Sequence, residues 1–415
     1  MLEHRSAARA GLAGPAADLP ESASGGVHFA GLDGLRAVAA LAVLVTHVGF
    51  QTGHSLSGFL GAATARLDIG VTIFFLLSGF LLYRPFALAH LGGTAGPRVG
   101  RFYARRALRI LPAYWVALGL AVVIVGRQFL DTPAEWLRQV FLVQVYPPGE
   151  LLIGTNHTWS LCTEVAFYAV LPVYAFLVRP RRDHGQGRQV RRELVVLLVL
   201  ALSALVWPVA YEHGSVSPYT GPLWLPAHLD WFALGMACAV LSANMQVTTK
   251  RPRWINELAS APGTCWVLAL ALFWLATTPL TGPRGLVART WQEEVARHIL
   301  YGAVALCILL PAVLPVDRSN LARRVLDGRV MRHLGRISYG LFLYQLIALD
   351  LVYRWTDFER FSGNFAVVTL AVTALTVAMA EVSWHVVEAP ALRLKPAARP
   401  SEVQRQLAPT TGHRE

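Results

Sequence analysis

The chain has 415 residues, of which 54% are hydrophobic and only 15% are charged. A soluble globular chain is about 25% charged, and a disordered or disulfide-stapled chain needs low hydrophobicity or dense cysteine, so the composition excludes all three classes. The net charge of +12 comes mainly from arginines in short runs between apolar segments, which is typical of the cytoplasmic loops of membrane proteins and not of a nucleic-acid-binding surface. The composition predicts an all-α, polytopic membrane protein.

Three parts follow one another along the chain. Residues 1–27 are rich in Ala, Gly and Pro and lack the apolar core of a signal peptide, so we expect a disordered cytoplasmic tail. A membrane domain over 28–392 follows, and 393–415 is expected to form a second disordered cytoplasmic tail. About ten segments of the domain approach the ~20 apolar residues of a membrane-spanning helix, and these are 35–52, 68–88, 110–126, 159–178, 193–210, 224–243, 262–280, 296–315, 336–353 and 364–387.

The basic runs predict the orientation of these helices. If ten helices cross the bilayer, the runs at 98–109, 179–192, 250–253, 318–336 and 393–399 all lie on one side. The positive-inside rule makes this side cytoplasmic, so both termini are expected there. A further apolar stretch, 136–146, is too short to span, and we predict a re-entrant or interfacial segment on the outer side that helps to wall a cavity.

The first span contains the clearest candidates for function, because an ionisable side chain at bilayer depth is costly unless it is paired or hydrated. Arg36 and His47 lie eleven residues apart, so a helix places them on one face at a separation of about 16 Å. Asp33 lies one turn before Arg36 and can pair with it. An imidazole titrates near neutral pH and can take a proton from a hydroxyl group. A structural histidine that bonds a neighbouring helix is the alternative for His47.

A second polar group stands at the outer start of the span at 159–178. It contains Trp159, Ser160, Glu164 and Tyr168, with His157 just before them. Glu164 can orient an imidazole or receive the proton of a substrate hydroxyl, or it can simply stabilise a helix N-terminus. Ser160 lacks the sequence surroundings of a serine-hydrolase nucleophile.

The arginines of the segment 101–112 form a third group. Arg105 and Arg109 stand at i, i+4, and Arg106 and Arg109 at i, i+3. A helix would therefore gather them into a cluster that can bind phosphates through bidentate hydrogen bonds. Ordinary anchoring of a span on the cytoplasmic side is the alternative.

Five motifs follow one another along residues 30–390. They are Leu32-Asp33-Gly34-Leu35-Arg36 with His47, Ile73-Phe74-Phe75-Leu76-Leu77-Ser78-Gly79-Phe80, Arg105-Arg106-x-x-Arg109-x-x-Pro112, Trp159-Ser160-Leu161 with Glu164 and Phe167-Tyr168, and Gly335-Arg336-Ile337-Ser338-Tyr339-Gly340. In this order they resemble the acyltransferase-3 family of bacterial inner-membrane O-acyltransferases. Several ordered motifs are more specific than any one alone.

The resemblance implies an enzyme of the bacterial inner membrane. Its acyl group, often acetyl, would come from cytoplasmic acyl-CoA and go to a hydroxyl of a sugar, glycolipid, polysaccharide or secondary metabolite. The family pattern implies that Arg36 and His47 are essential, and it links the arginine motif to the acyl donor. No permanently bound cofactor and no metal are expected.

Our mechanistic hypothesis assigns a role to each group. The cluster of Arg105, Arg106 and Arg109 binds the CoA phosphates. The pantetheine arm runs along the first helix past Arg36, which forms an ion pair with Asp33. His47 acts as general base on the acceptor hydroxyl, and Glu164 orients or charges His47. The candidates for the acceptor cavity are Ser78, Trp159, Ser160, Tyr168, His228, Asp230, Ser338, Tyr339 and Gln345.

Two departures from the family leave the acceptor open. Many relatives have a histidine where this chain has Gln345, which can hydrogen-bond but cannot titrate. Many also carry a fused esterase-like domain, which we do not expect here. A proton-coupled transporter or lipid flippase, in which His47 and Glu164 relay protons, is the alternative function, although no repeat relates the two halves of the sequence.

Overall fold

The computed structural model describes residues 29–394, apart from 30, 128–129, 148–150, 181–184, 215, 218, 249–256, 258–261, 286, 314–320 and 357. All regular elements in this part of the chain are helical, as predicted. The predicted tail 1–27 lies outside the described residues, and so does the predicted tail 393–415 except for its first two residues.

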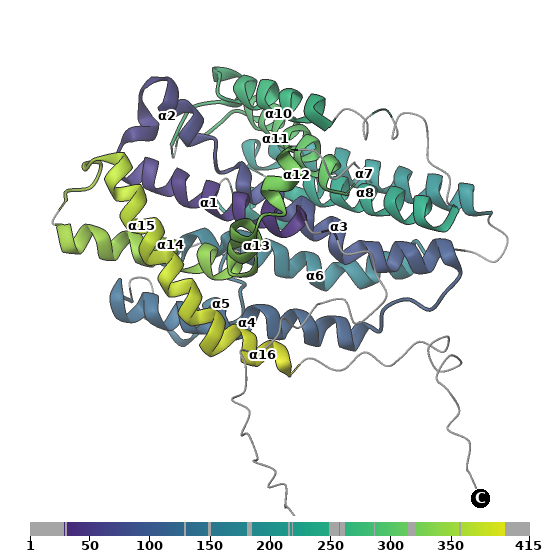
Figure 1. The fold of residues 1–415 in the computed structure, drawn as a ribbon, viewed down its shortest axis with the longest axis horizontal. Helices are drawn as coiled ribbons and strands as arrows, with labels where there is room; N and C mark the ends of the chain where they lie inside the picture. Colours follow the sequence, from purple (N-terminus) through teal and green to yellow (C-terminus); the bar gives the residue numbers. More distant parts are fainter. Residues whose placement is uncertain are drawn as a thin grey trace, which may run out of the picture. The chain divides into compact units, whose positions relative to one another are not determined.

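The helices of the described residues are shown in Figure 1. Those of the first half are α1 (Gly31–Gln51), η1 (His54–Leu56), α2 (Gly58–Ala65), α3 (Ile69–Gly92), α4 (Val99–Ile124), α5 (Pro133–Val140), η2 (Asn156–Thr158), α6 (Trp159–Leu177) and α7 (Gln186–Glu212). Those of the second half are η3 (Gly221–Leu223), η4 (Leu225–His228), α8 (Leu229–Thr248), α10 (Pro262–Ala276), η5 (Pro279–Thr281), α11 (Trp291–Val313), α12 (Leu321–Leu326), α13 (Arg329–Arg336), α14 (Ser338–Thr356), α15 (Phe365–Ser383), the π-turn η6 (Trp384–Glu388) and α16 (Ala389–Arg393).

The ten predicted spans all correspond to helices. Among the described residues, eight segments are long and apolar enough to cross a membrane, namely Gly31–Gln51, Gly58–Gly92, Val99–Ile124, Asn156–Leu177, Gln186–Glu212, Leu225–Thr248, Trp291–Val313 and Phe365–Arg393. The other two are α10, which has 15 residues, and α14, most of which is buried against other helices. Because α14 packs inside the bundle, its polar side chains do not have to face lipid.

Helix α4 begins earlier than the predicted span 110–126. It starts at Val99, so the arginine motif lies within the helix and not in the loop before it. Counting apolar residues detects the part of a helix that crosses the hydrocarbon, whereas arginine is a good helix former and does not end a helix.

The predicted re-entrant or interfacial segment 136–146 contains the end of the short helix α5, followed by turns. Thr132 caps this helix. The Tyr114 hydroxyl of α4 donates a hydrogen bond to the Gln139 carbonyl at 2.7 Å, and the Gln144 amide donates one to the Thr158 hydroxyl at 3.2 Å. The segment is therefore held between α4 and the start of α6.

Helices α3 and α8 share the most extensive contact between any two of the described helices. A Cβ atom on Gly235 would lie 2.0 Å from the Leu76 carbonyl oxygen, and one on Gly79 would lie 2.3 Å from that of Phe232. Only glycine fits at such distances, so these two positions allow the backbones to touch. The contact fixes where the start of α3 and the start of α8 meet the other helices.

Long-range contacts define two ends of the bundle. At one end, the start of α14 contacts α4, since the Tyr339 hydroxyl donates a hydrogen bond to the Ile110 carbonyl at 2.8 Å. We call this end, where α1, α4 and α14 begin, the basic end, because it carries Arg36 and the arginine motif. At the opposite end, Asp68 at the start of α3 contacts Arg297 near the start of α11 at 2.6 Å.

Candidate active site

The first turn of α1 forms part of the basic end. Arg36 donates a hydrogen bond to the Asp33 carboxylate at 3.0 Å, which confirms the predicted pairing. Helix α13 packs directly on this turn, because a Cβ atom on Gly335 would lie only 2.1 Å from the Asp33 carbonyl oxygen. The first and last of the five motifs therefore meet, although some 300 residues separate them in the sequence.

His47 lies further along α1 in a cluster with two other polar residues. Its ring centroid is 6.1 Å from that of His157, and the two rings are at 71°. The Gln345 side chain of α14 lies beside His47 and donates a hydrogen bond to the Phe342 carbonyl at 3.0 Å. The His47 Nδ1 and Gln345 Oε1 atoms are buried and have no hydrogen-bond partner among the described residues. We call His47, His157 and Gln345 the histidine cluster.

Glu164 lies in the interior between α3, α4 and α6. Its carboxylate accepts hydrogen bonds from the Ser78 hydroxyl and from the Tyr168 hydroxyl at 2.7 Å. The Arg106 guanidinium lies 6.0 Å from the centre of the Tyr168 ring, in cation–π range. Glu164 is thus linked through Tyr168 to the arginine motif.

Arg109 contacts two residues from the end of the chain. Its guanidinium lies 5.9 Å from the centre of the Tyr339 ring and 3.8 Å from the Glu388 carboxylate, which is 2% exposed. The Tyr339 hydroxyl lies within electrostatic range of both Glu164 and Arg109. The predicted donor arginines Arg106 and Arg109 therefore face a set of tyrosines and carboxylates inside the basic end.

The expected pairing of Glu164 with His47 is not formed. Among the described residues, Glu164 hydrogen-bonds Ser78 and Tyr168, whereas His47 is next to His157. Glu164 follows His157 by seven residues, which is about 10 Å along a helix. This distance places the carboxylate nearer the basic end than the His157 ring.

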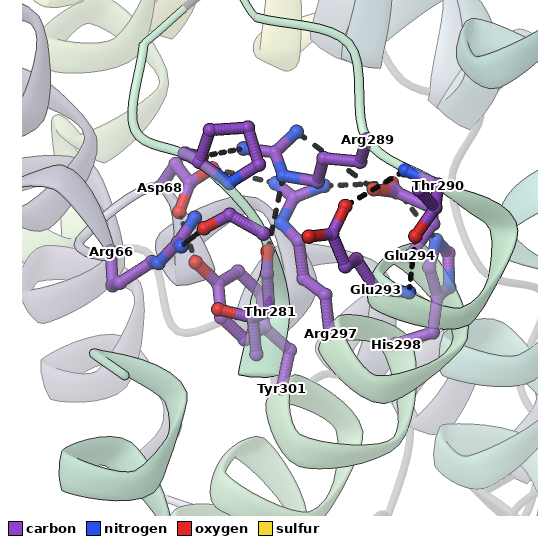
Figure 2. Close-up of polar contacts among 12 residues, drawn as sticks. Arg66, Asp68, Thr281, Arg289, Thr290, Glu293, Glu294, Arg297, His298 and Tyr301 are labelled. Atoms are coloured by element: carbon purple, nitrogen blue, oxygen red, sulfur yellow. Dashed lines mark hydrogen bonds and ion pairs between the residues drawn. The ribbon is translucent and has the colours of Figure 1, made fainter. Parts of the chain in front are cut away.

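A buried ionic network lies at the opposite end, between α3, α11 and the loop that precedes α11 (Figure 2). Arg297 contacts Asp68 at 2.6 Å and Glu294 at 3.0 Å, and the Tyr301 hydroxyl donates to Asp68 at 2.6 Å. Arg66 is 2% exposed and donates to the carbonyls of Ala276 and Gly282 in and after α10. Asp68 is within electrostatic range of His47, so this network adjoins the histidine cluster.

The predicted neighbours His228 and Asp230 do not pair with each other. Asp230 instead contacts His298 Nδ1 at 3.0 Å, and Glu294 lies 3.7 Å from His298 Nε2. The His228 ring stacks on that of His298 with centroids 5.6 Å apart, and neither nitrogen of His228 has a hydrogen-bond partner among the described residues. Asp230 and His298 therefore extend the ionic network.

The remaining predicted residues are near the two clusters and mostly have local partners. The Ser160 hydroxyl donates to the His157 carbonyl at 3.2 Å, and the Ser338 hydroxyl donates to the Gly335 carbonyl at 2.8 Å. The Trp159 ring lies 5.3 Å from that of His228. Among the described residues, no three His, Cys, Asp or Glu side chains are grouped so that they could hold a metal ion.

Sequence reasoning missed three residues of these clusters. His157 was visible in the motif before Trp159, but a histidine next to a helix start also fits a capping turn. Asp68 precedes a span and resembles an ordinary loop charge. Glu388 stands at helical spacing with Glu381 and His385 in the last span, a pattern that also fits contacts between helices, and it contacts Arg109 from the π-turn. A charged residue at the edge of an apolar run was the available signal for the last two.

This arrangement, a bundle of apolar helices with buried, mostly paired charges, defines a polytopic α-helical membrane protein. Over residues 29–382 the chain matches the acyltransferase-3 family, described as an acyltransferase domain, and it belongs to this family. The structure therefore belongs to a membrane acyltransferase domain. No solved structure matches the chain.

Several curated relatives support this membership. The Streptomyces mycarofaciens acyltransferase MdmB is 26% identical over 90% of this chain and 94% of its own length. The Bacillus subtilis protein YrhL, provisionally named a peptidoglycan O-acetyltransferase, is 25% identical over 88% of this chain and 55% of its own. A Staphylococcus aureus (strain COL) protein, provisionally named an O-acetyltransferase, is 23% identical over 88% of this chain and 57% of its own length. The chain thus spans little more than half the length of these last two relatives.

Proposed function

We propose that the protein is an integral-membrane O-acyltransferase. It moves an acetyl or another short acyl group from cytoplasmic acyl-CoA to a hydroxyl of a sugar, glycolipid, polysaccharide or secondary metabolite. The observation that carries the proposal is the His47 imidazole, which is half-buried and whose buried Nδ1 atom has no hydrogen-bond partner among the described residues. It lies inside a domain that belongs to the acyltransferase-3 family. The names of these relatives are in line with acyl transfer, and two of them with O-acetyl transfer.

His47 acts as the general base in this proposal. One of its ring nitrogens takes the proton of the acceptor hydroxyl as the hydroxyl oxygen bonds to the thioester carbonyl carbon. The carbon–sulfur bond then breaks, and the CoA sulfur leaves and receives the proton from His47. The products are an acyl ester and free CoA, and the imidazole returns to its neutral form.

The basic end binds the donor. Arg105, Arg106 and Arg109 follow one another along α4, and a guanidinium forms strong, two-point hydrogen bonds with phosphate. Arg36 lies at the same end, so the thioester arm can extend along α1 towards His47 over about 16 Å. The protein then lies in a bacterial inner membrane with this end and both termini in the cytoplasm.

The test uses the full chain in nanodiscs with acetyl-CoA. We expect the donor to raise the unfolding temperature of the wild type and of His47→Ala, but not of an Arg105→Gln/Arg109→Gln variant. Arg360→Gln is the matched control, because this exposed arginine lies at the opposite end. Stabilisation that survives the loss of both donor arginines would contradict the donor assignment.

Turnover is measured on membrane vesicles of the expressing bacterium that receive radiolabelled acetyl-CoA. We expect the wild type to transfer label into base-labile esters, and His47→Ala to lose this activity at least about 100-fold, as for loss of a general base. The control is His213→Ala, which alters an exposed histidine at the end of α7. Proton-driven flux without consumption of acetyl-CoA would replace this function with transport.

A further inference from the structure

Four buried polar atoms of the histidine cluster have no hydrogen-bond partner among the described residues. They are Nδ1 of His47, both ring nitrogens of His157, and Oε1 of Gln345. The backbone of Phe342 and Leu343 lies near the His157 ring, and the Gln345 side chain and the Val43 backbone lie near the His47 ring. None of these neighbours completes a hydrogen bond of good geometry with the four atoms. Buried polar groups nearly always have hydrogen-bond partners, and each exception costs about 1–3 kcal/mol. Four such atoms in one cluster therefore indicate a polar ligand.

The two imidazoles are spaced for one oxygen atom between them. Their centroids are 6.1 Å apart, so the rings do not stack, and no hydrogen bond joins them. Two N···O distances of about 2.9 Å that meet at one oxygen at a tetrahedral angle separate the two nitrogens by roughly 4.7 Å. Each nitrogen lies about 1 Å from its ring centroid, which makes this span compatible with the observed separation.

His157 is held in place by contacts that leave its imidazole unused. It lies in η2, where the Ser160 hydroxyl bonds its carbonyl, and its ring packs against Phe342 of α14 at 4.8 Å. The ring is therefore positioned by backbone and apolar contacts. These contacts give it no partner for either nitrogen, which differs from His298 and its two carboxylates.

We propose that His47 and His157 together form the binding subsite for the acceptor hydroxyl. The hydroxyl donates its proton to a ring nitrogen of His47, and an N–H of His157 donates a hydrogen bond to the same oxygen. Proton transfer to His47 leaves His157 unchanged in charge, so His157 orients the attacking oxygen and no further reactant is needed. The subsite recognises a primary or secondary alcohol of the acceptor. This inference rests on the proposed function and adds a catalytic residue to it.

The first test measures chemical reactivity in the wild type. Diethyl pyrocarbonate acylates neutral imidazoles that a small polar molecule can reach, and mass spectrometry locates the product. His157 and His298 are buried to the same extent, with exposures of 4% and 3%, so they form an internal comparison. We expect His47 and His157 to react much faster than His298. Equal, slow labelling of His157 and His298 would show that His157 is a packed core residue and overturn the proposal.

The second test measures transfer of radiolabelled acetyl groups in membrane vesicles to their endogenous acceptors. We expect His157→Gln to lower transfer about tenfold, the effect of one lost hydrogen bond, with unchanged stabilisation by acetyl-CoA. Thr155→Val is the matched control, because Thr155 lies buried in the same turn and its hydroxyl bonds only the Leu152 carbonyl. Wild-type transfer by a correctly folded His157→Gln variant would overturn the inference.

The two proposals fail in different ways. If wild-type vesicles transfer no label, or if His47→Ala transfers normally, the acyltransferase mechanism fails and the subsite fails with it. If His47 is required and His157→Gln keeps its full rate, only the subsite is wrong. The labelling test needs no variant, so it decides the case in which His157→Gln does not fold.

Discussion

Three histidines inside the bundle have nearly equal exposure but different partners. His157 and His228 are each 4% exposed and His298 is 3% exposed. His298 contacts Asp230 and Glu294, whereas His157 and His228 have no hydrogen-bond partner on either nitrogen among the described residues. Burial therefore does not distinguish these histidines, whereas their hydrogen-bond partners do. An imidazole nitrogen that already has a partner is less available to a ligand.

Arg297 is the centre of the ionic network and should be important for stability. Arg297→Met removes a partner of the buried Glu294 and of the partly exposed Asp68, and breaking a buried ion pair costs up to about 3–5 kcal/mol. We expect a large drop in the unfolding temperature in nanodiscs. Arg354→Met is the control: its partner Asp350 is one helical turn away on an exposed surface, where a pair contributes about 0–1 kcal/mol. Equal losses for the two variants would contradict this view of the network.

Tyr168 should hold the Glu164 carboxylate in place. Tyr168→Phe removes one of its two hydroxyl donors, and a hydrogen bond to a charged group contributes about 1.5–3 kcal/mol. We expect a lower unfolding temperature and weaker stabilisation by acetyl-CoA, because a Glu164 carboxylate that has lost this donor can pair with the neighbouring Arg106 and compete with the CoA phosphates. Tyr103→Phe loses only a surface bond to the Ala169 carbonyl and should leave both quantities nearly unchanged. A Tyr168→Phe variant that behaves like this control would remove Tyr168 from the donor region.

At the scale of elements, the apolar runs of the sequence predicted where the helices lie in the chain. They did not predict which helices contact one another. The ten predicted segments all form helices, because a backbone that crosses lipid must satisfy its own hydrogen bonds. The ends were less predictable, as α4 shows by starting at Val99. The position of the segment around α5 depends on hydrogen bonds of Tyr114 and Gln144. Their partners lie 25 and 14 residues away in the chain, at no helical spacing.

The contact between α3 and α8 supports a prediction about packing. Gly235→Ala places a methyl group 2.0 Å from the Leu76 carbonyl oxygen, so the helices must separate and the unfolding temperature should fall by an amount typical of an overpacked core, about 1–3 kcal/mol. Gly119→Ala is the matched control in α4, where nothing lies within 4 Å. It should stabilise the helix slightly, by up to about 1 kcal/mol. Tolerance of Gly235→Ala would refute this close approach.

At the scale of the whole molecule, the proposed orientation can be tested directly. Thr94 is exposed at the basic end, between α3 and α4, and Glu359 is exposed at the opposite end, between α14 and α15. The two test variants are Thr94→Cys and Glu359→Cys. With a membrane-impermeant maleimide on intact spheroplasts, we expect Glu359→Cys to react at once and Thr94→Cys only after permeabilisation. The reverse pattern would place the donor arginines outside the cell, away from acyl-CoA, and would contradict the proposed donor.

The sequence by itself determined the class of the protein, the helices and the family. Hydropathy and the arginine runs are local properties of the sequence. The thickness of the bilayer sets the length of an apolar run that can span it, and the arginine runs predict the orientation of the spans. Ordered motifs likewise need only the chain order. The pairing of Asp33 with Arg36 was also predictable, since one helical turn separates them.

Only the tertiary structure decided which polar groups meet. Glu164 bonds Ser78 and Tyr168 and not His47, Arg109 contacts Glu388, and His47 lies next to His157. Apart from the Glu164–Tyr168 bond within α6, these contacts join elements that are far apart in sequence, and they depend on how the helices rotate and how deep each residue lies. A shift of two helical turns is about 11 Å, which is enough to exchange one partner for another while the sequence pattern stays the same.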